Sequence, residues 1–142
     1  MSFIRTDWVA FDTNEFIYAI RHTSDRLPSV ELVYSLLYDV RLFVPYQVFK
    51  ELSHNLTVAE ETEFQAVART AQDLHLSFTP APSALVEVFE NRGAKRGDAR
   101  IAAELELAGI KWLISENRHF LSEITDLPFT VLSASEALEM LR

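Results

Sequence analysis

The sequence predicts an α/β protein with a central, mainly parallel sheet of four to five strands flanked by helices. Short apolar runs alternate along the chain with stretches in which apolar residues recur every three or four positions, which is typical of parallel strands joined by helices. The chain has 142 residues, of which 49% are hydrophobic and 11% aromatic, and it has three glycines. This length and composition predict a single domain, residues 1–142, with one packed core.

The first predicted strand and helix follow directly on each other. The apolar run 8–11 predicts a buried strand. The spacing of Phe16 and Ile20 places both side chains on one helical face, so a helix should start just after this strand. Asp12 or Thr13 can cap that helix, because both residue types accept hydrogen bonds from free backbone N–H groups.

The next part of the chain predicts a second strand among three helices. Pro28 suits the first turn of a helix, where its missing N–H group costs nothing. The run 42–44 is short and apolar and ends at Pro45, which predicts a second buried strand. Apolar periodicity then predicts a helix from Tyr46 and another near 58–74.

The second half of the chain continues the alternation. Ser83 and Asp98 stand where an N-cap is favourable, and Gly109 suits the residue after a helix end. The elements predicted here are an extended segment at 74–78, a helix at 83–90, a helix starting at Asp98, strands at 110–114 and 129–132, and a final helix from Ser133 or Ser135 to Met140.

Composition restricts the chemistry and the location of the protein. The chain has no cysteine, so disulfides and thiolate metal ligands are excluded, and any metal site must use oxygen or imidazole ligands. No apolar run approaches the roughly 20 residues of a membrane-spanning helix, and the first residues lack a signal-peptide core, so we expect a soluble, cytoplasmic protein. The net charge of −8 opposes nucleic-acid binding unless the acids hold cations or basic residues cluster beside them.

Polar side chains stand at comparable places after the predicted strands. Asp12 follows the first strand, Glu51 lies in the helix after the second, and Asp98 stands at a helix start. The polar run Ser115-Glu116-Asn117 follows the fourth strand. Because ligands of open parallel sheets bind outside the carboxyl ends of the strands, we expect these side chains to converge there. Oxygen ligands of this kind are those that Mg²⁺ or Mn²⁺ prefers.

The order of these motifs resembles the PIN-domain ribonuclease family, which includes the VapC-type toxins of bacterial toxin-antitoxin systems. The resemblance covers nearly the whole chain. The first motif is weak alone, whereas the ordered combination is fairly specific. The stretches that carry it are AFDTNEFIYAI, VPYQVFKEL, GDARIAAELELAGIKWLISENRHF and FTVLSASEAL.

The resemblance implies a small α/β domain whose clustered acids bind Mg²⁺ or Mn²⁺ and hydrolyse RNA phosphodiester bonds, which is the activity of an endoribonuclease. It implies that Asp12 and Asp98 are direct metal ligands. Glu51 would ligate a second ion, hold a bound water or act as a general base. Asn14 matches the polar residue that supports the first acid. Glu15, one position further on, is expected to point to solvent or toward a basic residue.

At the fourth motif the sequence departs from the family pattern. Many members carry an aspartate where Asn117 stands and a second acid where His119 stands. Asn117 can donate a hydrogen bond that orients a carboxylate, or it can ligate through its carbonyl oxygen. Glu116 can replace the missing acid only if its side chain turns inward. Ser115 supports the site or simply forms a turn.

A cluster of basic residues surrounds the third acid. Such a rim beside an acidic cavity would bind an RNA backbone despite the overall negative charge. The same loop, 92–96, can equally be a solvated turn. The predicted RNA-binding residues are Arg92, Lys95, Arg96 and Arg100, with Arg118 from the neighbouring strand end.

Other interpretations remain open for the single residues and for the whole chain. Taken alone, Asp12 and Asp98 can be helix caps and Glu51 a surface residue. The protein can also be an inactive binding module of the same fold, with RNA or a protein as partner. A phosphatase with an aspartate nucleophile would want a second aspartate at Asn14 and a downstream lysine motif. An antitoxin or a second copy of the chain can use apolar helical surface.

Overall fold

The computed structural model describes residues 6–142. Within them lies a five-stranded sheet in the order β3-β2-β1-β4-β5, in which every neighbouring pair is parallel. This confirms the predicted α/β class and the parallel sheet. The strands are β1 (Trp8–Phe11), β2 (Arg41–Val44), β3 (Asp73–Leu76), β4 (Trp112–Ile114) and β5 (Thr130–Leu132).

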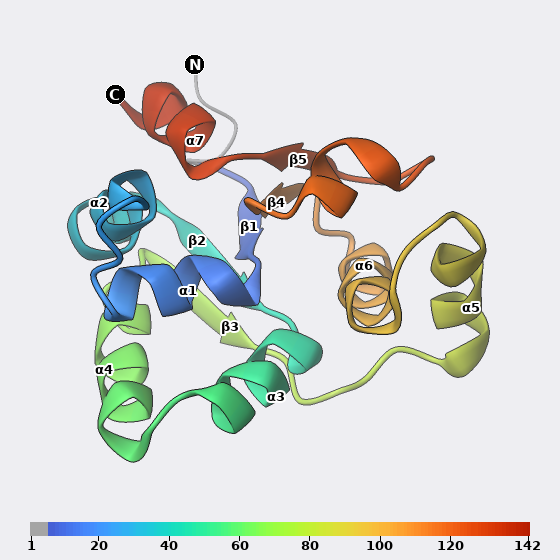
Figure 1. Ribbon diagram of the computed structural model, residues 1–142, viewed down its shortest axis with the longest axis horizontal. Coiled ribbons are helices and arrows are strands. Elements are labelled where there is room, and N and C mark those ends of the chain that lie inside the picture. Colours follow the sequence, from blue (N-terminus) through green and yellow to red (C-terminus); the bar gives the residue numbers. More distant parts are fainter. Residues whose placement is uncertain (1–5) are drawn as a thin grey trace.

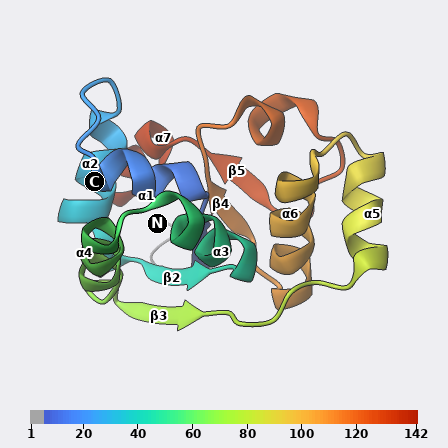
Figure 2. The ribbon, with the colours of Figure 1, turned by 60° about the horizontal axis from the view of Figure 1, so that its bottom comes forward.

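The helices flank this sheet, with α5 and α6 side by side on one side and α1, α2 and α4 on the other (Figures 1 and 2). A short 3₁₀ turn follows α2, and a π-helical turn lies between β4 and β5. The helices are α1 (Thr13–Ile20), α2 (Leu27–Ser35), α3 (Tyr46–Asn55), α4 (Val58–Ala68), α5 (Ser83–Asn91), α6 (Arg96–Ala108) and α7 (Ala134–Leu141), and the two turns are Leu37–Asp39 and His119–Glu123.

The central strand is the best buried part of the molecule. Val9, Ala10 and Phe11 of β1 are almost completely inaccessible to solvent. Phe11 stacks on Phe16 of α1 at a ring distance of 5.5 Å, and Phe16 in turn meets the ring of Phe64 from α4 at 5.0 Å. These aromatic contacts fix α1 against the carboxyl end of β1. They therefore hold in place the segment that carries Asp12.

Several predicted element ends need correction. The helix predicted over 58–74 ends at Ala68, because the chain then turns so that 73–76 can pair with β2; the Gln72 N–H already donates to the Val40 carbonyl at 2.9 Å. Asp98 is not the N-cap of its helix. Helix α6 begins two residues earlier, at Arg96, so Asp98 lies in its first turn.

Other end signals are confirmed. Asp12 is the N-cap of α1, with its carboxylate accepting a hydrogen bond from the Thr13 N–H. Gly109 ends α6 in the left-handed region at φ 71°, a conformation that glycine adopts without strain. Ser133 caps α7 in a reciprocal pair of hydrogen bonds with Glu136. Among residues 6–142, no helix combines the length and apolar character that crossing a membrane requires.

Candidate functional site

The strand order reverses between β1 and β4, which defines where a ligand site is expected. The chain leaves β1 for β2 on one side and leaves β4 for β5 on the other. The two strands are paired through Phe11 and Ile114, and the Asp12 N–H donates to the Ile114 carbonyl at 2.8 Å. Polar residues after these strands are therefore neighbours at the switch point of the sheet, where open α/β folds bind ligands.

A cavity of about 360 Å³ opens at this point. It brings together four residues predicted as catalytic, which come from the end of β1, from α3, from α6 and from the segment after β4. The predicted supporting residue Asn14 also lines it. The lining residues are Asp12, Thr13, Asn14, Ile17, Arg21, Glu51, Asn55, Asp98 and Asn117.

Asp12 is buried, with 6% of its surface exposed. Its Oδ2 accepts a hydrogen bond from the Ser115 hydroxyl at 2.7 Å, and its Oδ1 accepts one from the Thr13 N–H at 2.8 Å. Burial raises the pKa of Asp12 to about 6, although both hydrogen bonds act to lower it; the charges of Asp98 and Glu51 raise it further. Ser115 thus contacts the first acid directly, and its hydroxyl also accepts a hydrogen bond from the Asn117 N–H at 3.0 Å, so it forms a turn as well.

Glu51 is held on both of its carboxylate oxygens. The Thr13 hydroxyl donates to Oε1, and the Gln47 side-chain amide donates to Oε2 at 3.0 Å. The first turn of α6 passes close by, since a Cβ added at Gly97 would lie 3.1 Å from Glu51 Oε2. A side chain at that position would press on the carboxylate. Glu51 is therefore oriented toward the cavity by neighbours on α1 and α3.

Asn117 orients the third acid. Its side-chain NH₂ donates to Asp98 Oδ2 at 3.1 Å, while its side-chain carbonyl accepts from the His119 N–H at 3.0 Å. Of the two roles predicted for Asn117, the geometry favours the hydrogen-bond donor, because its oxygen already serves the backbone. The pKa of Asp98 is raised, mainly by burial, against the opposing effect of the Asn117 hydrogen bond.

Glu116 does not line this cavity. Its Oε2 accepts a hydrogen bond from the backbone N–H of Ala134, the first residue of α7, at 2.8 Å. A carboxylate at a helix N-terminus is favourable because it satisfies a free N–H group and faces the positive end of the helix dipole. The structure therefore turns Glu116 toward α7, while Asp12, Glu51 and Asp98 share the cavity.

The expectation that Glu15 points to solvent is wrong. Glu15 is fully buried, because α2 packs over this side of α1 and its residue Ser29 donates a hydrogen bond to Glu15 Oε1 at 3.1 Å. Its other oxygen has no hydrogen-bond partner among the described residues. Burial, together with the adjacent Glu116, raises the pKa of Glu15 well above its usual value.

The cavity has an excess of negative charge from Asp12, Glu51 and Asp98. Arg21 also lines it, but the guanidinium pairs with Glu60 at 2.9 Å. In the part of the chain that the structure describes, no three His, Cys, Asp or Glu side chains are grouped closely enough to hold a metal ion. Mg²⁺ commonly takes only one or two protein carboxylates and completes its shell with water and substrate phosphate. Asp12 and Asp98, which both line the cavity, would supply two such carboxylates.

The predicted basic rim is divided between different surroundings. Arg92 donates to the Asp126 carbonyl at 2.8 Å and lies over the ring of Phe89, so it packs against α5. Arg118 is exposed just before the π-helical turn. Lys95 lines a cavity that also includes Asp98, whereas Arg96 and Arg100 line a different cavity between α3, α5 and α6.

Two polar residues that position the acids were not predicted for that role. Thr13 was expected only as a cap, but its hydroxyl binds Glu51, 38 positions away in the chain. Gln47 precedes Glu51 by four residues on α3, and this spacing places both side chains on one helical face. The spacing is the one sequence signal that points to Gln47. No local sequence pattern predicts the contact between Thr13 and Glu51.

Fold and site together define an α/β protein with an acidic cavity at the switch point of a parallel sheet. Comparison with known protein families finds no match to the sequence, and comparison with curated proteins finds none either. Among solved structures, the chain is similar to PAE2754 from Pyrobaculum aerophilum, with a TM-score of 0.57 over 97% of each chain and 14% sequence identity. This similarity supports the fold.

The buried acids give the metal-free protein an expected pH dependence. The folded protein keeps a proton on Asp12 up to a pKa of about 6, whereas the unfolded chain releases it near 3.8. In EDTA, the contribution of Asp12 to the free energy of unfolding should therefore be largest at low pH and should fall by up to roughly 3 kcal/mol as the pH rises from 4 to 7. Burial likewise raises the pKa of Glu104 to about 7, which acts in the same direction.

Urea denaturation at pH 4, 5, 6 and 7 measures this effect. The Asp12→Asn variant is the matched control, since the share due to Asp12 should disappear from its pH profile. An unchanged slope in the variant would contradict the assigned burial of Asp12.

Proposed function

We propose that the protein is a Mg²⁺- or Mn²⁺-dependent endoribonuclease that hydrolyses RNA phosphodiester bonds. The observation that carries the proposal is the shared cavity of Asp12, Glu51 and Asp98 at the switch point of the sheet. The ordered motifs that resemble PIN-domain ribonucleases support it independently. The three acids come from segments far apart in the sequence, and solubility alone does not require such acids to share one cavity.

Asp12 and Asp98 are the residues that would hold the cation. When bound, a divalent ion lowers the pKa of a coordinated water and offsets charge on the phosphate. Ser115 and Thr13 fix both oxygens of Asp12, and Asn117 fixes one oxygen of Asp98. The acids are thus oriented before a substrate arrives, which is the arrangement that electrostatic catalysis requires.

Glu51 is the proposed general base. It faces Asp12 and Asp98 from α3, and its charge raises the pKa of both of those acids. The Thr13 and Gln47 hydrogen bonds hold its carboxylate in a fixed direction. From that position it can accept a proton from a water that attacks the phosphate.

The energetics of the site agree with a functional role. Burying carboxylates without a paired cation costs stability, and this cost appears as the raised pKa of Asp12 and Asp98. A chain selected for stability alone would replace such acids by neutral residues. Strongly perturbed acids in a cavity are therefore candidates for chemistry or cation binding.

Chelation of metal should abolish the activity. Purified protein is incubated with total cellular RNA in Mn²⁺ and, in parallel, in excess EDTA. We expect cleavage in Mn²⁺, none in EDTA, and recovery when Mn²⁺ is restored in excess. Mapping the fragment ends identifies internal cleavage, which an endonuclease requires.

Two results would contradict the proposal. Cleavage that persists in EDTA would point to metal-independent chemistry or to a contaminating ribonuclease. The Asp12→Asn variant, purified in parallel, reveals a contaminant, because the contaminant would cleave RNA in that preparation as well. Absence of cleavage in both Mn²⁺ and Mg²⁺ across varied RNA substrates would favour the inactive binding module. That second candidate is favoured by one observation, the lack of a grouped three-residue metal set among the described residues.

The finer proposal is that the nuclease is the toxin of a toxin-antitoxin pair. It rests on the resemblance to VapC-type toxins and needs a partner that covers or blocks the cavity. Several large apolar side chains are exposed and can take part in contacts with an antitoxin or with a second copy of the chain. The most exposed are Leu27, Tyr38, Val58, Phe78 and Leu107.

A further inference from the structure

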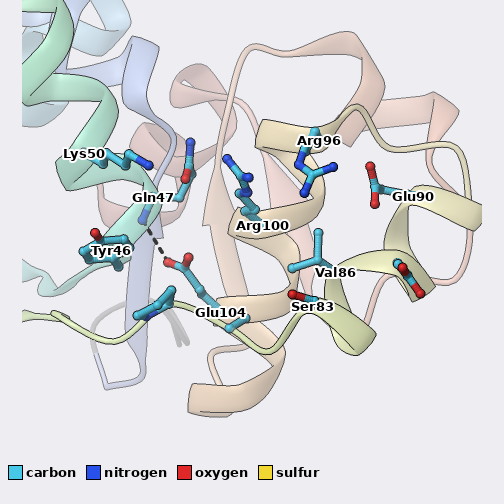
Figure 3. A pocket seen from close by; sticks show the side chains of 12 residues that line it. Tyr46, Gln47, Lys50, Ser83, Val86, Glu90, Arg96, Arg100 and Glu104 are labelled. Atoms are coloured by element: carbon cyan, nitrogen blue, oxygen red, sulfur yellow. Dashed lines mark hydrogen bonds between the residues drawn. The ribbon is translucent and has the colours of Figure 1, made fainter.

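A second cavity lies directly beside the acidic one. It has a volume of about 380 Å³ and is formed between α3, the loop before α5, α5 itself and α6 (Figure 3). This volume lies within the range of roughly 300 to 1,000 Å³ that is usual for small-molecule sites. Gln47 connects the two: it lines the second cavity, its side chain donates to Glu51 of the acidic cavity, and its backbone N–H donates to Glu104 at 2.9 Å.

Three cations line one part of this second cavity. Arg96 and Arg100 are one turn apart on α6, and Lys50 lies opposite them on α3 (Figure 3). No carboxylate among residues 6–142 lies within ion-pair distance of any of the three. Asp98 lies between the two arginines in the sequence, so the same turn of α6 serves both cavities. These unpaired cations offer a site for a phosphate group.

Three carboxylates also line this cavity, Glu87 and Glu90 from α5 and Glu104 from α6. Pro80, Ala81 and Val86 give it an apolar wall. Glu104 reaches into it from α6 and is 4% exposed, with one oxygen fixed by the Gln47 N–H. Burial raises the pKa of Glu104 to about 7, so near neutral pH its carboxyl group can accept or donate a hydrogen bond. An apolar wall edged by polar side chains is an environment that can bind a flat heterocyclic base.

We propose that this cavity binds the nucleotide next to the scissile phosphate of a single-stranded RNA. The phosphate lies against Lys50, Arg96 and Arg100, and the base packs on the wall formed by Val86 with its polar edge toward Glu104. The proposal rests on the proposed nuclease function and deepens it, since it assigns the substrate-binding half of the site.

The test measures the binding of 5′-mononucleotides to the full chain in EDTA, where no cleavage occurs. AMP, CMP, GMP and UMP are each titrated by calorimetry or followed by ligand-observed NMR, with inorganic phosphate as a further probe. We expect at least one mononucleotide to bind at least tenfold more tightly than phosphate. Arg100→Gln should weaken this binding at least tenfold, whereas Arg69→Gln, at an exposed arginine just after α4 that does not line this cavity, should not.

A second variant tests the contact with the base. Glu104→Gln should change the order of preference among the four mononucleotides, because it fixes the hydrogen-bonding pattern of that side chain. Thermal denaturation verifies that each variant is folded. Lack of mononucleotide binding by the wild type overturns the proposal, and so does equal binding by folded Arg100→Gln or binding no tighter than that of phosphate.

Failure here can be distinguished from failure of the nuclease proposal. Asp12→Asn should retain mononucleotide binding, because Asp12 lies in the other cavity. If mononucleotides bind but RNA is never cleaved, the nucleotide site stands and the protein is a binding module. If RNA is cleaved in Mn²⁺ but no mononucleotide binds, the nuclease stands and the nucleotide site is overturned.

Discussion

Replacing Asp12 by asparagine is expected to reduce metal-dependent RNA cleavage by roughly a hundred- to a thousandfold or more while preserving the fold. The amide has the same shape, and its oxygen can still accept the Thr13 N–H that caps α1. It lacks the negative charge that would hold a divalent cation. The loss should therefore appear in the rate of cleavage at saturating RNA and should not be restored by raising the Mn²⁺ concentration severalfold.

The same substitution should make the metal-free protein more stable. At pH 7 the wild type carries a buried charge whose pKa is raised from 3.8 to about 6, and asparagine removes the cost of that charge. The expected gain in the free energy of unfolding is up to roughly 3 kcal/mol, as measured by urea denaturation in EDTA. A gain in stability together with a loss of activity is what a functional site predicts and what a purely structural aspartate does not.

Asp25→Asn is a matched control, since Asp25 is exposed in the turn before α2. It should change neither the rate of cleavage nor the stability by a measurable amount. Undiminished cleavage by Asp12→Asn would refute the assigned metal site. A marked loss of stability in that variant would instead show that the carboxylate is needed to hold β1 to β4 through Ser115.

The position of Asp12 could be predicted because it follows from rules that act along the backbone. An apolar strand that ends in Asp12, and another that ends in Ser115, place both side chains at one edge of a parallel sheet. The capping preference of Asp12 is local as well. These features depend on residues that are near each other in sequence or in register, and pattern reasoning deals with both.

The contacts that orient the acids could not be predicted, because they join distant segments. Thr13 and Glu51 are 38 positions apart, and the Gln47 backbone and Glu104 are 57 apart. Glu15 shows the same limit in another form. Its residue type favours solvent, and only the packing of α2 over α1 buries it. Tertiary packing here overrides the preference of glutamate for solvent, and no local sequence pattern predicts that outcome.

Asp98→Asn is expected to weaken Mn²⁺ binding at least about tenfold, which separates an active nuclease from an inactive module. Burial is the main cause of the raised pKa of Asp98, and the Asn117 side chain donates a hydrogen bond to its carboxylate. Asp98 lines the same cavity as Asp12. Calorimetric titration with Mn²⁺ measures the affinity directly. In parallel, thermal denaturation should show wild-type stabilisation that increases with the Mn²⁺ concentration, because the ion binds only the folded state.

The two proposals then differ in a measurable way. An inactive module should show no Mn²⁺ site that Asp98→Asn removes, whereas the nuclease requires one. Asp25→Asn, an exposed aspartate of the same charge, should keep the wild-type affinity and so exclude an effect of net charge alone. Equal Mn²⁺ affinity in wild type and Asp98→Asn would place the cation elsewhere. The raised pKa of Asp12 and Asp98 would then reflect burial in a cavity whose ligand is not a metal.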